Sequence, residues 1–291
     1  MAEASLRQRI DAYQQRHKWL AFPLAVHKRF GEDRGKHYAA SISYYAFFSL
    51  FPLMLSFVAV LGVVLRGRPE LQQDLIDSAL GRFPVIGTQI TEKQLDGNGW
   101  TLAIGLLAAL WAGLGVIYAA QHAMDTMWDV PGVVRPNFLI RRLRALPMLG
   151  VVAFGPVAGS AIAGIATQLD ELPGVARFAT AAGTLAVNAA SLVAGFSLLT
   201  VAKPPWRKLL PGAAAGSVAL LAVQVGGAWY FDRVVVDASD TYGTFATVIG
   251  LLTWLALHAR FTLYAAEVNV VKAGKLWPRA LMGTDPFTKV V

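Results

Sequence analysis

The chain alternates between long apolar stretches and short polar connections. Six stretches are longer than about 20 residues and carry few charged side chains, and a helix of that length can cross the hydrocarbon core of a membrane. They cover residues 39–65, 100–124, 145–167, 176–202, 209–231 and 243–271. The pattern therefore predicts an all-α, polytopic membrane protein with six transmembrane helices.

The positions of the basic residues predict how these helices are oriented. Of the 26 Lys and Arg residues, 19 fall in the N-terminal segment, the second and fourth connections and the C-terminal tail, and six fall in the other three connections or, for Arg177, at the edge of one. Lys and Arg accumulate on the cytoplasmic side of membrane proteins. Both termini are therefore expected to be cytoplasmic.

This orientation divides the chain into three parts. Residues 1–38 form a basic, amphipathic cytoplasmic segment, 39–272 the six-helix transmembrane domain, and 273–291 a cytoplasmic tail. The longest connection on the far side, 66–99, has apolar residues at helical spacing and predicts an extracytoplasmic amphipathic helix. Residues 5–30 mix apolar and basic side chains, which suits either a helix lying on an anionic leaflet or an ordinary solvated helix.

Composition agrees with a membrane protein. The 291 residues are 55% hydrophobic and 15% charged, whereas soluble domains carry about 25% charged residues. The net charge of +8 would suggest nucleic acid as a partner in a soluble protein. Here the charge is concentrated beside the membrane, so we expect anionic lipid headgroups as partners and no nucleic acid. The chain has no cysteine, which excludes disulfides and thiol chemistry.

The last apolar stretch contains an unusual set of polar residues: His258, Arg260, Tyr264, Glu267 and Asn269. Helical spacing places Arg260, Tyr264 and Glu267 on one face, with Glu267 about 10 Å from Arg260 along the axis. Such a face is expected to point into the protein, because ionisable groups facing lipid are costly. It could form an internal ion-pair network, or a wet cavity in which Arg260 binds an anion.

The first stretch carries Tyr44, Tyr45, Ser49 and Pro52. Pro52 cannot donate a hydrogen bond to the carbonyl of Phe48, so a kink is expected there, with Ser49 placed to compensate. Two interpretations stay open: a packing kink, or a broken helix lining a cavity. Glycines at a spacing of four, such as Gly212 and Gly216, predict close helix contacts.

Familiar catalytic motifs are absent from the sequence. No two of the five histidines have the spacing of a helical metal site, and there is no HExxH motif, P-loop, GxSxG motif or dinucleotide-binding glycine motif. We therefore expect no metal, no cofactor and no enzymatic activity.

Several segments together resemble the YihY / virulence factor BrkB family of bacterial inner-membrane proteins, formerly labelled ribonuclease BN. They are AASISYYAFFSLFPLM in the first stretch, AMDTMWDVPGVVRPNFLIRRLRAL after the second, and YGTFATVIGLLTW and AAEVNVV in the last. The resemblance implies an inner-membrane location. The matching positions are Tyr44, Tyr45, Ser49, Pro52, Arg135, Tyr242, Gly243, Glu267 and Asn269. The chain departs from the family pattern with Ala265 in place of glycine and Arg260 in place of a neutral polar residue.

Two functions fit these features. The first is a transporter or flippase for an anionic amphiphile, such as a phospholipid or a lipid-linked envelope precursor. The second is a non-transporting scaffold or envelope-assembly partner, and a homodimer is compatible with either. A ribonuclease would need a catalytic constellation that the sequence does not show. The residues predicted to bind substrate are Arg260, Glu267, Tyr264, His258, Asn269, Tyr45, Ser49, Pro52 and Tyr44.

Overall fold

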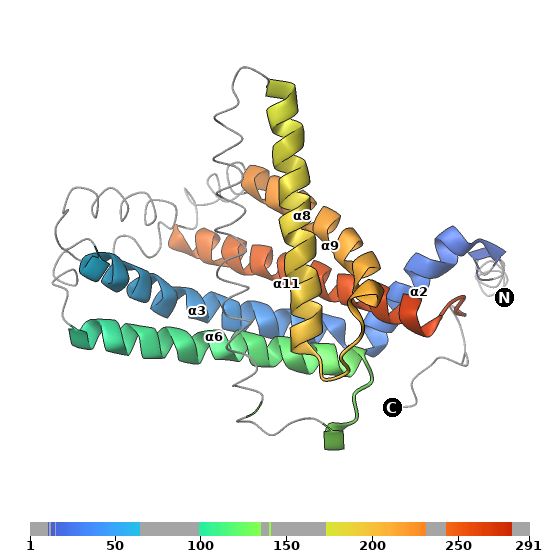
Figure 1. The fold of residues 1–291 in the computed structure, drawn as a ribbon, viewed down its shortest axis with the longest axis horizontal. Coiled ribbons are helices and arrows are strands. Elements are labelled where there is room, and N and C mark those ends of the chain that lie inside the picture. The colour runs from blue at the N-terminus through green and yellow to red at the C-terminus, as the bar shows by residue number, and fades with distance from the viewer. Residues whose placement is uncertain are drawn as a thin grey trace.

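The computed structural model describes residues 11, 13, 14, 16–64, 99–134, 140, 173–230 and 243–280, and these contain helices but no strand. Figure 1 shows the long helices. They are α2 (Lys18–Glu32), α3 (Gly35–Val64), α6 (Gly99–Met127), α8 (Pro173–Leu199), α9 (Trp206–Tyr230) and α11 (Thr244–Gly274), with a short 3-10 turn, η2 (Gly132–Val134), after α6.

Five of the six apolar stretches coincide with long helices, namely α3, α6, α8, α9 and α11. The all-α prediction is confirmed for the part of the chain that the structure describes. The third stretch, 145–167, and the amphipathic connection predicted over 66–99 lie outside the described residues, apart from Gly99. Among the described helices, Phe178–Leu199 and Phe245–Gly274 are long and apolar enough to cross a membrane by length and composition.

Proline marks two helix starts. Pro173 is the first residue of α8, and Pro204 and Pro205 directly precede Trp206, the first residue of α9. Proline suits the beginning of a helix because its missing N–H would have no intrahelical acceptor there. At the other end of the chain, α11 stops where Lys275 adopts a left-handed backbone conformation, a common way for a helix to end.

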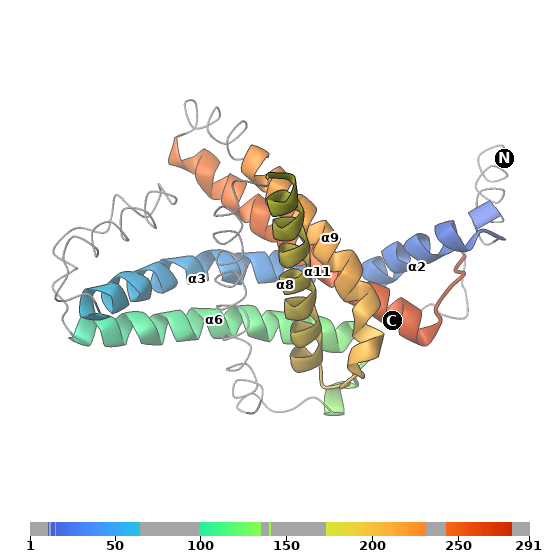
Figure 2. The same cartoon turned by 45° about the horizontal axis from the view of Figure 1, so that its top comes forward.

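The helices converge at one end of the molecule. α3 and α6 lie side by side, and α11 approaches them near α2 and separates from them away from α2 (Figures 1 and 2). The core lies at the convergent end and includes the fully buried side chains of Phe30, Met124, Phe196, Leu209 and Leu263. Among the residues whose burial is described, those of α8 and α11 are buried mainly at this end of the two helices.

α8 runs across the α3–α6 pair rather than alongside it (Figures 1 and 2). Its C-terminal half is anchored, since Leu192, Phe196 and Leu199 are buried, whereas Val175 and Phe178 in its first turns are exposed. Its main partner is α9. This arrangement differs from the near-parallel bundle that consecutive spans usually form, because only one end of α8 is packed against the other described helices.

The N-terminal helix α2 packs on the protein. Ala21, Ala25, Val26 and Phe30 on its apolar face are buried against α11 and the residues that follow it, while Trp19 is exposed. Neither interpretation of residues 5–30, a helix on the lipid surface or a solvated helix, includes this contact, which the structure adds. Its apolar face stabilises a helix–helix interface with α11.

Candidate functional site

A groove of about 380 Å³ lies where α2, α9 and α11 meet. α9 contributes only alanine and glycine, and these small residues leave space between the helices. The lining residues are Phe22, Pro23, Val26 and His27 of α2, Ala215, Gly216 and Ala219 of α9, and Phe261, Tyr264, Ala265 and Val268 of α11. The groove is therefore apolar except for His27 and Tyr264.

These two polar residues contact each other. Nδ1 of His27 lies 2.9 Å from the hydroxyl of Tyr264, at hydrogen-bonding distance. On its other side, the Tyr264 ring stacks on Phe30 with 3.9 Å between ring centroids. Tyr264 is thus half-buried and fixed between the two helices, which places the predicted site residue in the wall of the groove.

Arg260 lies one helical turn before Tyr264 and next to Phe261, which lines the groove. Its side chain is exposed and makes no ion pair within the part of the chain that the structure describes. A cation therefore flanks the groove at the edge formed by Tyr264.

Arg260 was expected on a face that points into the protein, and its side chain is exposed in the described fold. Glu267, two turns further along the same face, is completely buried. The difference in burial follows the neighbours of α11. Phe30 and Val26 of α2 pack against it at the level of Tyr264 and Val268, and α11 diverges from α3 away from α2 (Figure 2). Helical spacing gives the direction of a side chain around the axis, and the two positions share that direction but differ in their neighbours.

Asn269 braces the contact between α9 and α11. Its Oδ1 accepts a hydrogen bond of 2.6 Å from the backbone N–H of Gly212, and the side chain is fully buried. A Cβ atom on Gly212 would collide with the carbonyl oxygen of Ala265, and one on Gly216 would lie 2.6 Å from the Ala265 Cβ. The close helix contact predicted from these glycines is confirmed, and Ala265 fits because Gly216 has no side chain.

His258 lies away from the groove lining. Its Nδ1 is 3.1 Å from the carbonyl oxygen of Trp254, and the two rings are 4.0 Å apart. Both residues belong to the same helix, so the imidazole is satisfied locally. The structure places His258 beside Trp254 rather than beside Tyr264.

The predicted residues of the first stretch lie on α3, against α6. Tyr45 covers Gly115 of α6, and Tyr44 contacts Tyr45 and Phe48. α3 continues as one helix through Pro52, so it is not broken there. The Ser49 hydroxyl donates to the carbonyl of Ala46 at 2.7 Å rather than to the carbonyl that Pro52 leaves free. None of these four residues belongs to the lining of the α2–α9–α11 groove.

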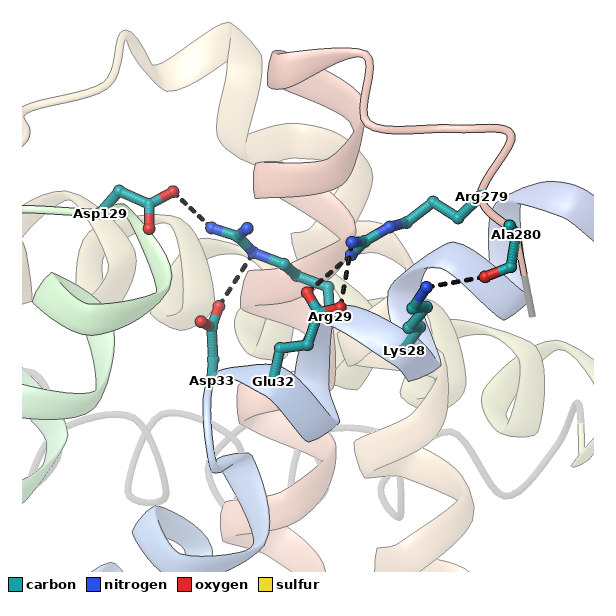
Figure 3. A network of polar contacts seen from close by, with 7 residues as sticks. All are labelled: Lys28, Arg29, Glu32, Asp33, Asp129, Arg279 and Ala280. Carbon is teal, nitrogen blue, oxygen red and sulfur yellow. Dashed lines mark hydrogen bonds and ion pairs between the residues drawn. The ribbon is translucent and has the colours of Figure 1, made fainter. Parts of the chain in front are cut away.

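Sequence reasoning missed a network of charges around α2, which Figure 3 shows. Buried Arg29 pairs with Asp33 at 3.1 Å and also with Asp129, which follows α6. Arg279, also buried, forms a two-pronged pair with Glu32 at 2.8 and 3.0 Å.

Backbone oxygens of the tail extend this network. Lys28 donates to the carbonyl of Ala280 at 2.7 Å, and Gln14 donates to the carbonyl of Arg279 at 2.6 Å. We call the contacts of Gln14, Lys28 and Glu32 with residues 279–280 the α2–tail clasp. The clasp joins α2 and the residues just before it to the tail. The sequence predicts only a basic, amphipathic segment here, because the spacing of its charges does not identify partners 247 and 252 positions further along the chain.

Asp125 is a second residue that the pattern did not single out. It is completely buried near the end of α6, and its Oδ1 accepts hydrogen bonds from the Val201 N–H at 2.9 Å and the Thr200 hydroxyl at 3.3 Å. It thereby fixes the connection between α8 and α9. The sequence does offer one signal for this role, since Asp125 is the one carboxylate in the mostly apolar helix α6.

The described residues contain no group of three or more His, Cys, Asp or Glu side chains that could hold a metal ion. The groove offers two polar side chains, bonded to each other, and a cation at its edge. This arrangement can bind an anionic group beside an apolar surface.

The sequence of the chain has clear relatives. The sequence model of the family described as virulence factor BrkB matches residues 26–279. The chain is 25% identical to the ribonuclease-like protein YfkH of Bacillus subtilis (strain 168), over 87% of this chain and 95% of that protein.

Two further relatives are named as membrane proteins. The inner membrane protein YhjD of Escherichia coli (strain K12) is 22% identical, over 94% of this chain and 87% of that protein. A UPF0761 membrane protein of Laribacter hongkongensis (strain HLHK9) is 28% identical over 89% of this chain, which spans 63% of that protein's length. No solved structure matches the chain.

Proposed function

The chain belongs to the virulence factor BrkB family of membrane proteins, and we propose that it binds an anionic amphiphile in the bacterial inner membrane and carries it between the two leaflets. The amphiphile is a phospholipid or a lipid-linked envelope precursor.

The observation that carries this proposal is the exposed Arg260 within the apolar helix Phe245–Gly274. An arginine at the centre of a membrane helix costs about 2.5–3.5 kcal/mol on insertion scales. An anionic headgroup bound to the guanidinium would offset that cost. The planar fork of five N–H donors matches the geometry of a phosphate or carboxylate group.

The proposal includes six membrane spans with both termini in the cytoplasm. Its support is the positions of the basic residues and the coincidence of α3, α6, α8, α9 and α11 with five of the apolar stretches. The α2–tail clasp adds support, because it holds the two ends of the folded chain on one side. Reporter fusions after Tyr13 and at the C-terminus would test it, since both should be active only in the cytoplasm.

The site in this proposal consists of Arg260 and Tyr264. Glu267 and Asn269 are fully buried at the packed end of α11, and we assign them to bracing of the helices rather than to contact with substrate. Ser49, which is buried and bonded within α3, and Pro52, which is half-buried in the same helix, are likewise assigned a structural role. His258, Tyr44 and Tyr45 lie outside the groove lining and have no role in it.

The alternative function, a scaffold that transports nothing, is favoured by one observation. Trp100, Ile104, Leu107 and Trp111 are all exposed and follow one face of α6. Such a face suits either lipid or the helix of a partner protein. Crosslinking from this face in cells would support the scaffold if it captured one stable protein partner, and the transporter if it captured lipid.

The test of the proposed function is native mass spectrometry of the purified protein in mild detergent. The wild type should retain an anionic lipid, and Arg260→Ala should lose it. Lys272→Ala is the matched control, since Lys272 is an exposed cation on the same helix and lies away from the groove lining. Retention of the lipid by Arg260→Ala at the wild-type level would overturn the site.

Transport itself needs a second measurement. Vesicles containing the purified protein and a fluorescent phosphatidylglycerol should show movement of the probe between leaflets, with Lys272→Ala similar to the wild type. Arg260→Ala should reduce the rate to that of protein-free vesicles. Retained lipid without movement in any variant would favour the scaffold.

A further inference from the structure

We infer that the α2–α9–α11 groove holds the acyl chain of the amphiphile whose anionic head is bound by Arg260. This inference rests on the proposed function and adds where the apolar part of the ligand binds. It makes the site bipartite, with a cation at one edge and an apolar channel beside it.

The chemistry of the lining favours an acyl chain. Nine of the eleven lining residues are apolar or glycine, and the other two, His27 and Tyr264, are joined by a hydrogen bond of 2.9 Å. A polar ligand would have to break that bond to find a partner in the groove. An acyl chain needs no hydrogen bond, and burying its methylene groups is favourable by itself.

The size of the groove fits one chain. Its volume of about 380 Å³ is at the lower end of the range of roughly 300–1,000 Å³ for small-molecule sites. The lining residue Ala215 of α9 and the residues Pro23 and His27 of α2 are exposed, so the groove opens at the surface of the described fold. An acyl chain can therefore enter the groove from the side without first separating the helices.

The position of the groove relative to Arg260 gives the ligand a continuous path. Phe261 follows Arg260 directly, and Tyr264 is one turn away on the same helix; both line the groove. A headgroup on the guanidinium would therefore sit where the apolar lining begins. The close approach of α9 to α11 at Gly212 and Asn269 is beside the groove, and it keeps the two walls at a fixed spacing.

Two adjacent alanines of α9 provide a matched test. Ala214 and Ala215 are both exposed, and only Ala215 lines the groove. Ala215→Trp should fill the groove, whereas Ala214→Trp adds the same side chain outside it. The probes are palmitoyl lysophosphatidylglycerol and glycerol phosphate, added to each purified variant and measured by native mass spectrometry.

The expected result is that the wild type and Ala214→Trp bind the lysolipid equally. Ala215→Trp should bind the lysolipid at least about tenfold more weakly, because the loss of even a few methylene contacts lowers the affinity by that factor. All three should bind glycerol phosphate equally weakly. A series of lysophosphatidylglycerols with increasing chain length, bound to the wild type, gives the same information without any substitution, since affinity should rise with chain length.

The outcomes separate the two proposals. If Arg260→Ala releases the lipid while Ala215→Trp and Ala214→Trp retain it equally, or if chain length has no effect on wild-type affinity, the groove is not the acyl site and the proposed function stands. If the wild type retains no anionic lipid, the proposed function fails as well. A crosslink between the groove lining and another segment of this protein would show that the segment occupies the groove, and it would also overturn the inference.

Discussion

The two halves of α11 lie in contrasting surroundings. At the half near α2, Leu263, Glu267 and Asn269 are completely buried, and Arg29 of α2 and Arg279 of the tail are paired with carboxylates. At the other half, Phe245 is 64% exposed and Ile249 46% exposed, and Arg260 is exposed between the two halves. One apolar helix therefore serves as core at one end and as surface at the other.

This difference teaches how charge is tolerated in an apolar protein. Arg279 and Arg29 are buried and have carboxylate partners within the described fold, whereas Arg260 has none there. The paired arginines hold segments together, and the unpaired one is available to a ligand. Substitutions of Arg279 and Arg260 test this difference between the arginines, and substitutions of Gly212 and Tyr264 test the packing of the buried half of α11.

The largest effect is expected for Arg279→Ala. It removes both hydrogen bonds to Glu32, and breaking a buried pair by deleting one partner costs about 3–5 kcal/mol. Because the sequence has no cysteine, a single Ala25→Cys reporter, on the buried face of α2 that packs against α11, can measure the opening of this helix. Reaction with a maleimide should become about a hundredfold faster. Lys275→Ala, at an exposed position, should leave the rate unchanged, and an equal rate in Arg279→Ala would contradict the role of the clasp.

The next effect is expected at the contact between α9 and α11. Gly212→Ala would force a methyl group against the backbone of Ala265, and overpacking costs about 1–3 kcal/mol. Gly226→Ala, in the same helix with open space around it, should be neutral or stabilising by up to about 1 kcal/mol. Thermal unfolding in detergent measures both. Equal melting temperatures for the two variants would show that the helices are not in close contact at Gly212.

A smaller effect is expected for Tyr264→Phe. The substitution removes the hydrogen bond to His27 and keeps the stack on Phe30, so the cost should be about 0.5–1.5 kcal/mol. Tyr45→Phe is the control, because its hydroxyl has no hydrogen-bond partner among the described residues. Adding His27→Ala to Tyr264→Phe should lower the stability little further, and full additivity would argue against the bond.

The smallest effect on stability is expected for Arg260→Ala. Substitutions of exposed residues usually change the free energy of unfolding by less than about 0.5 kcal/mol, and Arg260 is exposed. Its thermal unfolding without added lipid should match the wild type, even though lipid retention is lost. A destabilisation similar to that of Arg279→Ala would instead make Arg260 part of the internal bracing.

The sequence was sufficient to predict the long helices, and their bounds differ from the apolar stretches by a few residues. The last stretch was predicted over 243–271 and α11 covers Thr244–Gly274. Length and apolar content determine where such helices lie, because every backbone group must be bonded internally in hydrocarbon. The close contact at Gly212 and Gly216 was predictable for a similar reason, since small residues at a spacing of four favour it.

The partners of the polar residues could not be predicted. Helical periodicity places Arg260 and Glu267 on one face, but burial depends on which helix lies beside each level of α11. The pairing of Glu32 with Arg279 and of Asn269 with Gly212 joins residues distant in the chain. Only the three-dimensional arrangement reveals them, and with them the groove between α2, α9 and α11.

The α2–tail clasp has a consequence for the number of times the chain crosses the membrane. Glu32 precedes every long apolar helix and Arg279 follows the last, yet their side chains are 2.8 Å apart. Two groups in contact cannot be on opposite faces of a membrane, so this ion pair requires an even number of crossings between them. The six spans proposed above meet that requirement, whereas five crossings, by α3, α6, α8, α9 and α11 alone, would separate the two residues. One ion pair thus constrains any topology proposed for the chain.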